Sequence, residues 1–225
     1  MEYLYCSLIG YGIGTFNPSY LIGKNKGFDI RRTGSGNAGA SNALILFGKA
    51  VGFICAVLDI LKAFLAVRLT KKLFPGFQHC FAVTGSACVL GHIFPFYMGF
   101  RGGKGLACLG GIILAYNWKL FLLMLAAELL VALITDYICF VPVTAALALP
   151  ILYAIIEKDR IGALILGIVT VVVFIKHTEN FKRILNGTEL HLSFLWRPQA
   201  EVNRIKANFL WDRGEEDPKP ENKEQ

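Results

Sequence analysis

Long runs of apolar residues recur along the chain and are separated by short polar segments. A helix that crosses a bilayer needs roughly 20 mainly apolar residues, and most of the runs approach this length. Seven runs are candidates: 2–22, 49–70, 79–98, 105–118, 119–135, 137–156 and 160–176. Only the stretch 116–119 separates the fourth run from the fifth, so six spans also fit. The pattern predicts an all-α, polytopic integral membrane bundle of about seven transmembrane helices.

Composition agrees with a membrane protein. The 225 residues are 55% hydrophobic and only 17% charged, which is too apolar for a soluble domain of this size. The first run has Glu2 near its start and lacks a basic leader and a cleavage site, so we interpret it as a span. The six cysteines form no Cys-x-x-Cys pair, and we interpret them as small buried side chains instead of zinc ligands.

The basic residues indicate orientation. The formal net charge is +7, but the Lys and Arg residues are spread between the apolar runs, so the charge does not indicate nucleic-acid binding. They are frequent in 23–48, in 99–104 and from Lys176 onward, and a bundle of seven spans puts these three regions on one side. Cytoplasmic loops are enriched in Lys and Arg. We therefore expect an outside N-terminus and a cytoplasmic C-terminus.

The first polar segment with candidate chemistry is 33–42, which consists of small and amide residues. It contains Gly-x-Gly-x-x-Gly at 34–39, with Asp59 twenty residues later. A dinucleotide-binding fingerprint needs a buried strand before the glycines, whereas Arg31 and Arg32 precede them and Asp59 lies in an apolar helical run. Two interpretations stay open: a flexible loop, or a loop whose backbone approaches a ligand closely.

The second segment, 91–105, places backbone amides beside Arg101 and Lys104. Successive N–H groups and fixed cations at a helix start can bind a phosphate, although an ordinary positive-inside loop has the same composition. Met98 and Gly105 stand where a Walker A motif needs Gly and Ser or Thr, so no metal is implied.

The third segment, 177–189, continues the last apolar run. If the helix continues, His177, Asn180 and Ile184 share a face, and Glu179 pairs with Arg183 on another. An imidazole and an amide on one face could orient a hydroxyl group. A juxtamembrane helix with snorkelling cations is the alternative.

Two charged residues lie inside the second apolar run. Asp59 and Lys62 are three residues apart, where charge is costly unless it is paired or faces a polar cavity. We expect them to pair with each other in a structural role.

The three segments together resemble the acyl-phosphate:glycerol-3-phosphate acyltransferase family, the PlsY type. The residues that carry the resemblance are Gly-Ser-Gly-Asn-Ala-Gly-Ala-Ser-Asn, Gly-His-Ile-Phe-Pro-Phe-Tyr with Phe-Arg-Gly-Gly-Lys-Gly, Asp-Ile-Leu-Lys, and His-Thr-Glu-Asn-Phe-Lys-Arg with Asn-Gly-Thr-Glu. The resemblance covers about residues 1–190.

The resemblance implies a multi-pass enzyme of the bacterial inner (plasma) membrane that needs no metal or cofactor. Its reaction in phospholipid biosynthesis would transfer a fatty acyl group from acyl phosphate to the sn-1 hydroxyl of glycerol 3-phosphate, giving lysophosphatidic acid and phosphate. The implied partners are these two substrates, membrane lipid and a soluble enzyme that forms acyl phosphate, with no nucleic acid. Acyl-CoA is not the expected donor, because no Asp follows any of the four histidines at the fifth position.

The resemblance also implies roles for individual residues. The catalytic set is Ser35, Lys104, His177 and Asn180, and the substrate-binding set is Gly34, Gly36, Asn37, Asn42, Arg101, Gly102 and Gly103. The structural set is Asp59, Lys62 and Glu189. Whether His177 or the donor's phosphate takes the hydroxyl proton stays open.

Two positions depart from the family pattern. Ile45 stands where the family usually has an arginine, and Cys139 stands where it tends to have a serine. These departures suggest a divergent paralogue with altered substrates or without catalysis. A transporter of a phosphorylated solute is another alternative, but the three segments do not repeat and their polar residues cluster at one face.

The chain divides into a membrane acyltransferase domain, 1–195, and a cytoplasmic tail, 196–225. Val202, Ile205 and Phe209 have helical spacing, and a polar stretch follows from Gly214. We expect an interfacial helix followed by a disordered end.

Overall fold

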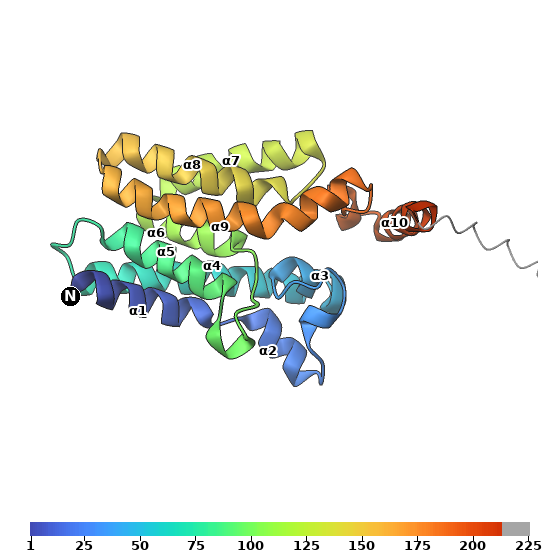
Figure 1. The fold of residues 1–225 in the computed structure, drawn as a ribbon, viewed down its shortest axis with the longest axis horizontal. Coiled ribbons are helices and arrows are strands. Elements are labelled where there is room, and N and C mark those ends of the chain that lie inside the picture. Colours follow the sequence, from blue (N-terminus) through green and yellow to red (C-terminus); the bar gives the residue numbers. More distant parts are fainter. Residues whose placement is uncertain (213–225) are drawn as a thin grey trace, which may run out of the picture.

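The computed structural model describes residues 1–212, and every regular element in this part of the chain is helical. The helices form an elongated bundle with the N-terminus at one end and α10 at the other (Figure 1). The helices of 14 or more residues are α1 (Glu2–Thr15), α4 (Lys49–Leu73), α5 (Cys80–Ile93), α7 (Trp118–Thr135), α8 (Phe140–Glu157), α9 (Arg160–Leu185) and α10 (Pro198–Asp212). The shorter elements are α2 (Pro18–Asn25), η1 (Ile30–Arg32), α3 (Ala40–Phe47), η2 (Phe96–Met98), α6 (Leu106–Tyr116) and η3 (Leu192–Leu195). The all-α prediction is confirmed for these residues.

Within residues 1–212, five helical segments are long and apolar enough to cross a bilayer. They are Lys49–Leu73, Cys80–Met98, Trp118–Thr135, Phe140–Glu157 and Arg160–Leu185. Large apolar side chains are exposed on the outside of these segments, including Ile134 (83% exposed) and Leu164 (74% exposed). Apolar surface on this scale is unsuited to water, whereas helices satisfy their own backbone groups in lipid. The chain is therefore a membrane protein.

The first predicted span, 2–22, is two helices instead of one. α1 ends at Thr15 and α2 begins at Pro18. Proline disfavours a helical conformation in the preceding residue, and Asn17 is extended, with its side chain accepting a hydrogen bond from the amide of Tyr20. A capping residue followed by proline is a strong helix start. The prediction of one continuous helix over 2–22 was wrong, because the apolar run continues across this start signal.

The fourth and fifth runs are separate helices. The boundary between α6 and α7 falls at Asn117, whose backbone is extended. Its side-chain oxygen accepts hydrogen bonds from the amides of Lys119 and Leu120, which have no partner within the helix. Asn117 therefore ends one helix and caps the next.

Helices α1 and α5 pack closely through glycines. A Cβ atom at Gly14 would lie 2.1 Å from the carbonyl oxygen of Cys88, and one at Gly10 would lie 2.5 Å from the carbonyl oxygen of Thr84. On the other side, a Cβ atom at Gly91 would lie 2.4 Å from a carbonyl oxygen of α1. Small residues four apart allow helix backbones to approach in membranes. The contact excludes any larger side chain at these positions.

The main apolar core lies between α4, α5, α6, α8 and α9, where Leu109, Ile112, Leu149 and Val173 are almost completely buried. All six cysteines are buried and free. The interpretation of the cysteines as small buried side chains is confirmed.

The polar segments lie toward one end of the bundle. α2, α3, the end of α9 and α10 are at the end opposite the N-terminus (Figure 1). α9 continues past the apolar run 160–176 to Leu185, which puts His177 and Asn180 on the helix as expected. A helix, α10, also occupies the predicted amphipathic region of the tail. The stretch from Gly214 onward, predicted to be disordered, lies outside the described residues.

Candidate active site

The end of α9 and the loop before α6 meet in a network of polar side chains. Lys104 Nζ donates a hydrogen bond to Asn180 Oδ1, and Asn180 Nδ2 donates to Glu189 Oε1 at 2.6 Å. The other carboxylate oxygen of Glu189 accepts from Arg183 Nε at 2.6 Å. Asn180 and Glu189 are buried. The network joins two of the residues expected to be catalytic to the glutamate expected to brace them.

Lys104 is the cation of this network whose charge is most sensitive to pH. Burial, and then the positive charge of Arg183, lower the pKa of Lys104 to about 8, while the carboxylate of Glu189 acts in the opposite direction. A lysine with this pKa is still mostly charged at neutral pH. It can hold an anion at pH 7 and loses this ability in mildly alkaline solution.

His177 lies one turn before Asn180 on the same helix and is only 2% exposed. Its Nδ1 lies 2.8 Å from the carbonyl oxygen of Val173. A carbonyl oxygen can only accept, so we assign the hydrogen to Nδ1. In the neutral ring this leaves Nε2 with a free lone pair, which is the form that can accept a proton.

The loop 33–39 contains the other expected catalytic residue, Ser35, which is exposed together with Gly34 and Gly36. Both glycines have positive φ, +61° and +70°, a region that other residues rarely adopt. Asn37 is half-buried. Within the described residues, no hydrogen bond joins Ser35 or Asn37 directly to the network around Asn180, so the loop and the network are separate parts of the site.

Asn42 holds the backbone of this loop through hydrogen bonds and is not exposed to a ligand. It is completely buried, and its Nδ2 donates to the carbonyl oxygens of Ile30 and Thr33 at 2.9 and 3.0 Å. Its Oδ1 accepts from the amide of Ser35 at 2.9 Å. These three bonds use most of the amide's capacity. The structure therefore gives Asn42 a supporting role in place of the direct substrate contact that we expected.

Gly102 and Gly103 also differ from the expectation. Their amides donate to the carbonyl oxygens of Ile93 and His92 at 2.9 and 3.1 Å, so they close the end of α5. A Cβ atom at either glycine would lie 2.1 Å from an atom of His92. The predicted anion site made of free amides at these two residues was wrong, because the helix end already uses those amides. The cations Arg101, which is exposed, and Lys104 remain available.

A buried ion-pair network supports this loop. Lys62 Nζ lies 2.6 Å from Asp59 Oδ1, so the predicted pairing within α4 is confirmed. The same ammonium lies 2.9 Å from His92 Nδ1 and donates to the carbonyl oxygen of Phe16. The cluster connects α4 and α5 to the break after α1. Gly103 packs against the imidazole of His92, so the network also fixes the start of the loop that holds Lys104.

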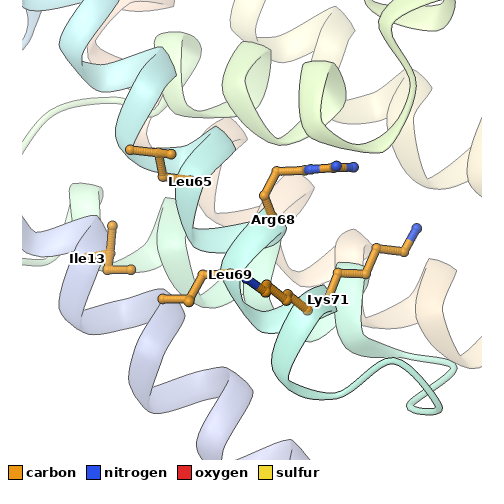
Figure 2. Close-up of a pocket in the computed structure, with 6 residues that line it drawn as sticks. Ile13, Leu65, Arg68, Leu69 and Lys71 are labelled. Carbon is orange, nitrogen blue, oxygen red and sulfur yellow. The ribbon is translucent and has the colours of Figure 1, made fainter.

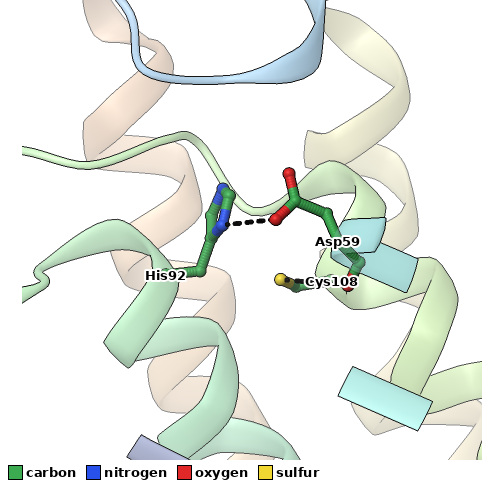
Figure 3. A group of neighbouring side chains, drawn as sticks. All are labelled: Asp59, His92 and Cys108. Atoms are coloured by element: carbon green, nitrogen blue, oxygen red, sulfur yellow. Dashed lines mark hydrogen bonds and ion pairs between the residues drawn. The ribbon is translucent and has the colours of Figure 1, made fainter. Parts of the chain in front are cut away.

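Asp59, His92 and Cys108 offer three potential metal ligands whose donor atoms lie within 4.8 Å of one another (Figure 3). The Lys62 ammonium, however, already contacts both the carboxylate and the imidazole. A divalent ion would be repelled by this buried cation. We interpret the cluster as a structural ion pair, which is consistent with the structural role expected for Asp59 and Lys62.

Arg31 connects two of the polar segments, although no role beyond topology was predicted for it. Its guanidinium donates to the carbonyl oxygens of Met98 and Arg101. It is also paired with Asp29 at 2.6 Å and lies over the ring of Tyr20. The side-chain hydrogen bond from Arg31, more than burial, sets the pKa of Asp29, which is lowered to about 2. The nearby acidic residue at position 29, close to the glycine loop, was the sequence signal that could have indicated a structural role for Arg31.

The predicted pair of Glu179 and Arg183 is absent within residues 1–212, because Arg183 pairs with Glu189 instead.

The two departures from the family pattern lie in or near the polar segments. Ile45 is half-buried in α3. Cys139 is buried at the start of α8, and burial, followed by the charge of Glu189, raises its pKa to about 11. The charges of the network therefore influence the pKa of this thiol.

A groove between α1 and α4 is lined by none of the predicted site residues (Figure 2). Its walls are apolar side chains and three cations: Ile13, Leu65, Leu69, Arg68, Lys71 and Lys72. It contains none of the groups that we expected to be catalytic.

Comparisons with known proteins identify one family. The family model for glycerol-3-phosphate acyltransferase matches residues 4–187. Glycerol-3-phosphate acyltransferase 2 of Thermotoga maritima is 40% identical over 191 residues, which is 84% of this chain and 96% of that protein. The glycerol-3-phosphate acyltransferase of Lactiplantibacillus plantarum is 36% identical over 207 residues, 91% of this chain and 100% of that protein.

Solved structures point the same way. The glycerol 3-phosphate form of PlsY, an integral membrane glycerol 3-phosphate acyltransferase, matches with a TM-score of 0.77 and 30% identity over 87% of this chain and 98% of that chain. Its lysophosphatidic acid form matches with a TM-score of 0.73. On its motifs, its fold and these similarities, the chain belongs to the glycerol-3-phosphate acyltransferase family.

Proposed function

We propose that the protein transfers a fatty acyl group from acyl phosphate to the sn-1 hydroxyl of glycerol 3-phosphate. The products are lysophosphatidic acid and inorganic phosphate. Family membership supports the reaction class, and PlsY forms with glycerol 3-phosphate and with lysophosphatidic acid are known. The observation on this chain that carries the proposal is the hydrogen-bonded network of Lys104, Asn180 and Glu189, with His177 one turn away.

The network has the charge that two phosphate-bearing substrates need. Lys104 keeps two ammonium hydrogens beyond its bond to Asn180, and Arg101 is exposed nearby in the same loop. Fixed cations bind phosphate oxygens and stabilise charge that develops during transfer. We propose that Arg101 and Lys104 hold a phosphate group, while Ser35, Asn37 and the backbone of Gly34 and Gly36 bind the polar part of a substrate.

The reaction needs positioning more than a strong nucleophile, because acyl phosphate is an activated anhydride. The hydroxyl oxygen of glycerol 3-phosphate attacks the carbonyl carbon and forms the new ester bond. The bond between that carbon and the phosphate oxygen breaks, and phosphate leaves with the electron pair. The hydroxyl proton goes either to His177 Nε2 or to an oxygen of the departing phosphate, and both routes balance the reaction.

We propose that seven helices, with α1 and α6 as the shorter members, cross the bacterial plasma membrane. The basic loops would then face the cytoplasm, with the N-terminus outside. Glycerol 3-phosphate is polar and the acyl chain is apolar. At the cytoplasmic interface, glycerol 3-phosphate can enter the site from water while the acyl chain stays in the lipid. A soluble enzyme that forms acyl phosphate would supply the donor, and the tail helix α10 would lie at the membrane surface.

Ile45 and Cys139 support a second candidate, a relative with altered substrates or without catalysis. The position of Cys139 near the charged network is the observation that favours it, because a thiol donates weaker hydrogen bonds than the hydroxyl of serine.

Phosphate release by the purified protein tests both candidates. Palmitoyl phosphate and glycerol 3-phosphate are supplied to the wild type and to His177→Ala, Lys104→Ala and Ile45→Arg. Lys49→Ala is a matched control, because Lys49 is an exposed lysine outside the site. We expect release that depends on glycerol 3-phosphate, that falls by at least about 100-fold in the two alanine variants of the site, and that is unchanged in Lys49→Ala.

Other outcomes discriminate between the alternatives. An inactive wild type that gains activity through Ile45→Arg would identify a diverged relative. No turnover in any variant, combined with uptake of glycerol 3-phosphate by vesicles that contain the protein, would identify a transporter.

A further inference from the structure

The tail helix α10 contacts the candidate active site, although it lies beyond the part of the chain that the family model matches. That match ends at residue 187. α10 begins at Pro198, and its side chains reach back to the segment 187–191, directly after α9. The same segment contains Glu189, which holds Asn180. Residues outside the family core are therefore bonded to a supporting part of the site.

Arg204 makes the central contacts. Its Nη1 donates to the carbonyl oxygen of Gly187 at 2.6 Å, and its Nη2 donates to the carbonyl oxygen of Glu189 at 2.5 Å. Asn208 Nδ2 also donates to the carbonyl oxygen of Gly187, at 2.6 Å. A planar guanidinium that bonds two carbonyls through two nitrogens fixes their relative position. The turn at Gly187, where φ is +66°, is held in this way.

Glu201 anchors this arginine. Its Oε2 lies 2.9 Å from Arg204 Nη2 and also accepts from the amide of His191 at 3.2 Å. Glu201 as a whole is only 6% exposed. Burial opposes its ionisation, but the hydrogen bonds from Arg204 and from the His191 amide prevail and lower the pKa of Glu201. The pair is charged at neutral pH. It bonds the segment 187–191 at both ends, through the carbonyl oxygen of Gly187 and the amide of His191.

The carboxylate of Glu189 depends on the backbone that carries it. Besides these bonds from α10, the turn is held by its own amides: those of Thr188 and Glu189 both donate to the carbonyl oxygen of Arg183, and that of Gly187 donates to the carbonyl oxygen of Ile184. Short segments beyond a helix end are mobile unless tied down. We propose that Arg204 is a positioning residue, which holds the backbone after α9 so that Glu189 stays bonded to Asn180. This inference rests on the proposed acyl transfer for its effect on turnover.

The charge state of Lys104 gives a readout that a merely structural role would not move. The groups whose charges act on Lys104 are, from α9, His177, Glu179 and Arg183, together with Glu189 and Cys139. Glu189, Glu179 and Cys139 all favour the charged lysine, and the Glu189 carboxylate has the largest effect of the three. If the carboxylate moves away, the pKa of Lys104 falls below about 8, so the charged form is lost at lower pH.

The test compares full-length wild type with Arg204→Ala, Arg204→Lys and Lys206→Ala. Lys206 is the matched control, because it is an exposed cation of the same helix. Three quantities are measured: amide hydrogen exchange in 187–191, the pH dependence of Lys104 labelling by acetic anhydride, and kcat and KM for glycerol 3-phosphate. Thermal unfolding checks that each variant is folded.

In Arg204→Ala we expect faster exchange in 187–191, a midpoint for Lys104 labelling lower by about half a pH unit or more, and kcat/KM lower by about 5- to 100-fold. Arg204→Lys should recover part of each change, and Lys206→Ala should match wild type.

Unchanged exchange and an unchanged labelling midpoint in Arg204→Ala would overturn the positioning role, whatever the activity. If wild type shows no turnover while both physical readouts change in Arg204→Ala, the positioning role stands and the proposed reaction fails.

Discussion

The pKa of Lys104 predicts how turnover should depend on pH. With a pKa of about 8, the ammonium is about 90% populated at pH 7 and about 10% populated at pH 9. If this ammonium holds a substrate phosphate, kcat/KM should fall about tenfold for each pH unit above about 8. Bound phosphate favours the charged lysine, so the falling limb of kcat should lie at higher pH than that of kcat/KM.

The assay follows phosphate release from palmitoyl phosphate between pH 7 and pH 10, in detergent micelles, at limiting and at saturating glycerol 3-phosphate. Above pH 7 the phosphate of glycerol 3-phosphate is already a dianion, because its second pKa is about 6. Donor hydrolysis without acceptor is subtracted. Lys104→Arg is the decisive variant, since a guanidinium stays charged throughout this range.

We expect Lys104→Arg to be slower than wild type at neutral pH, because the larger group cannot reproduce the contact with Asn180. Its profile should nevertheless lose the falling limb near pH 8. A wild-type kcat/KM that stays flat to pH 10, or a falling limb that persists unchanged in Lys104→Arg, would refute the assignment of this limb to Lys104.

Three other changes test the packing and the loop. Gly14→Ala would place a methyl group 2.1 Å from a backbone oxygen, so we expect a loss of about 1–3 kcal/mol in stability and a lower Tm in detergent; Gly12→Ala, whose methyl meets open space, is the control, and equal Tm values would contradict the tight contact. Asp59→Asn leaves the buried ammonium of Lys62 without its counter-charge, which should cost about 3–5 kcal/mol of unfolding free energy; adding Lys62→Met should recover part of it, and purely additive losses would argue against the pair. Asn42→Ala removes three hydrogen bonds of about 1 kcal/mol each, so KM for glycerol 3-phosphate should rise several-fold, and an unchanged KM would separate this loop from substrate binding.

Features that depend on helical periodicity could be predicted from the sequence. Asp59 and Lys62 are three residues apart in one apolar helix, which places them on one face, and they do pair. The same reasoning put His177 and Asn180 on one side of a continued helix, where both are buried. Local chain geometry suffices for such contacts.

Features that depend on where a loop folds could not be predicted in this way. Periodicity favoured Glu179 as the partner of Arg183, but Glu189 competes from a turn whose path depends on distant contacts with α10. The amides of Gly102 and Gly103 looked free because the sequence does not show that the loop folds back on α5. The break at Asn17 was the exception, since the following proline was a visible signal.

The glycine contact between α1 and α5 has a consequence for how the protein is made. α1 has 14 residues and is about 21 Å long, which is shorter than the hydrocarbon core of about 30 Å. Its glycine face has little to bury in lipid alone and needs the carbonyl ridge of α5. At a synthesis rate of about 5–20 residues per second, Gly91 follows Gly14 by roughly 4–15 seconds. During that interval the glycine face of the nascent helix lacks its native partner α5, so the insertion machinery or the surrounding lipid must cover this face until α5 has been made.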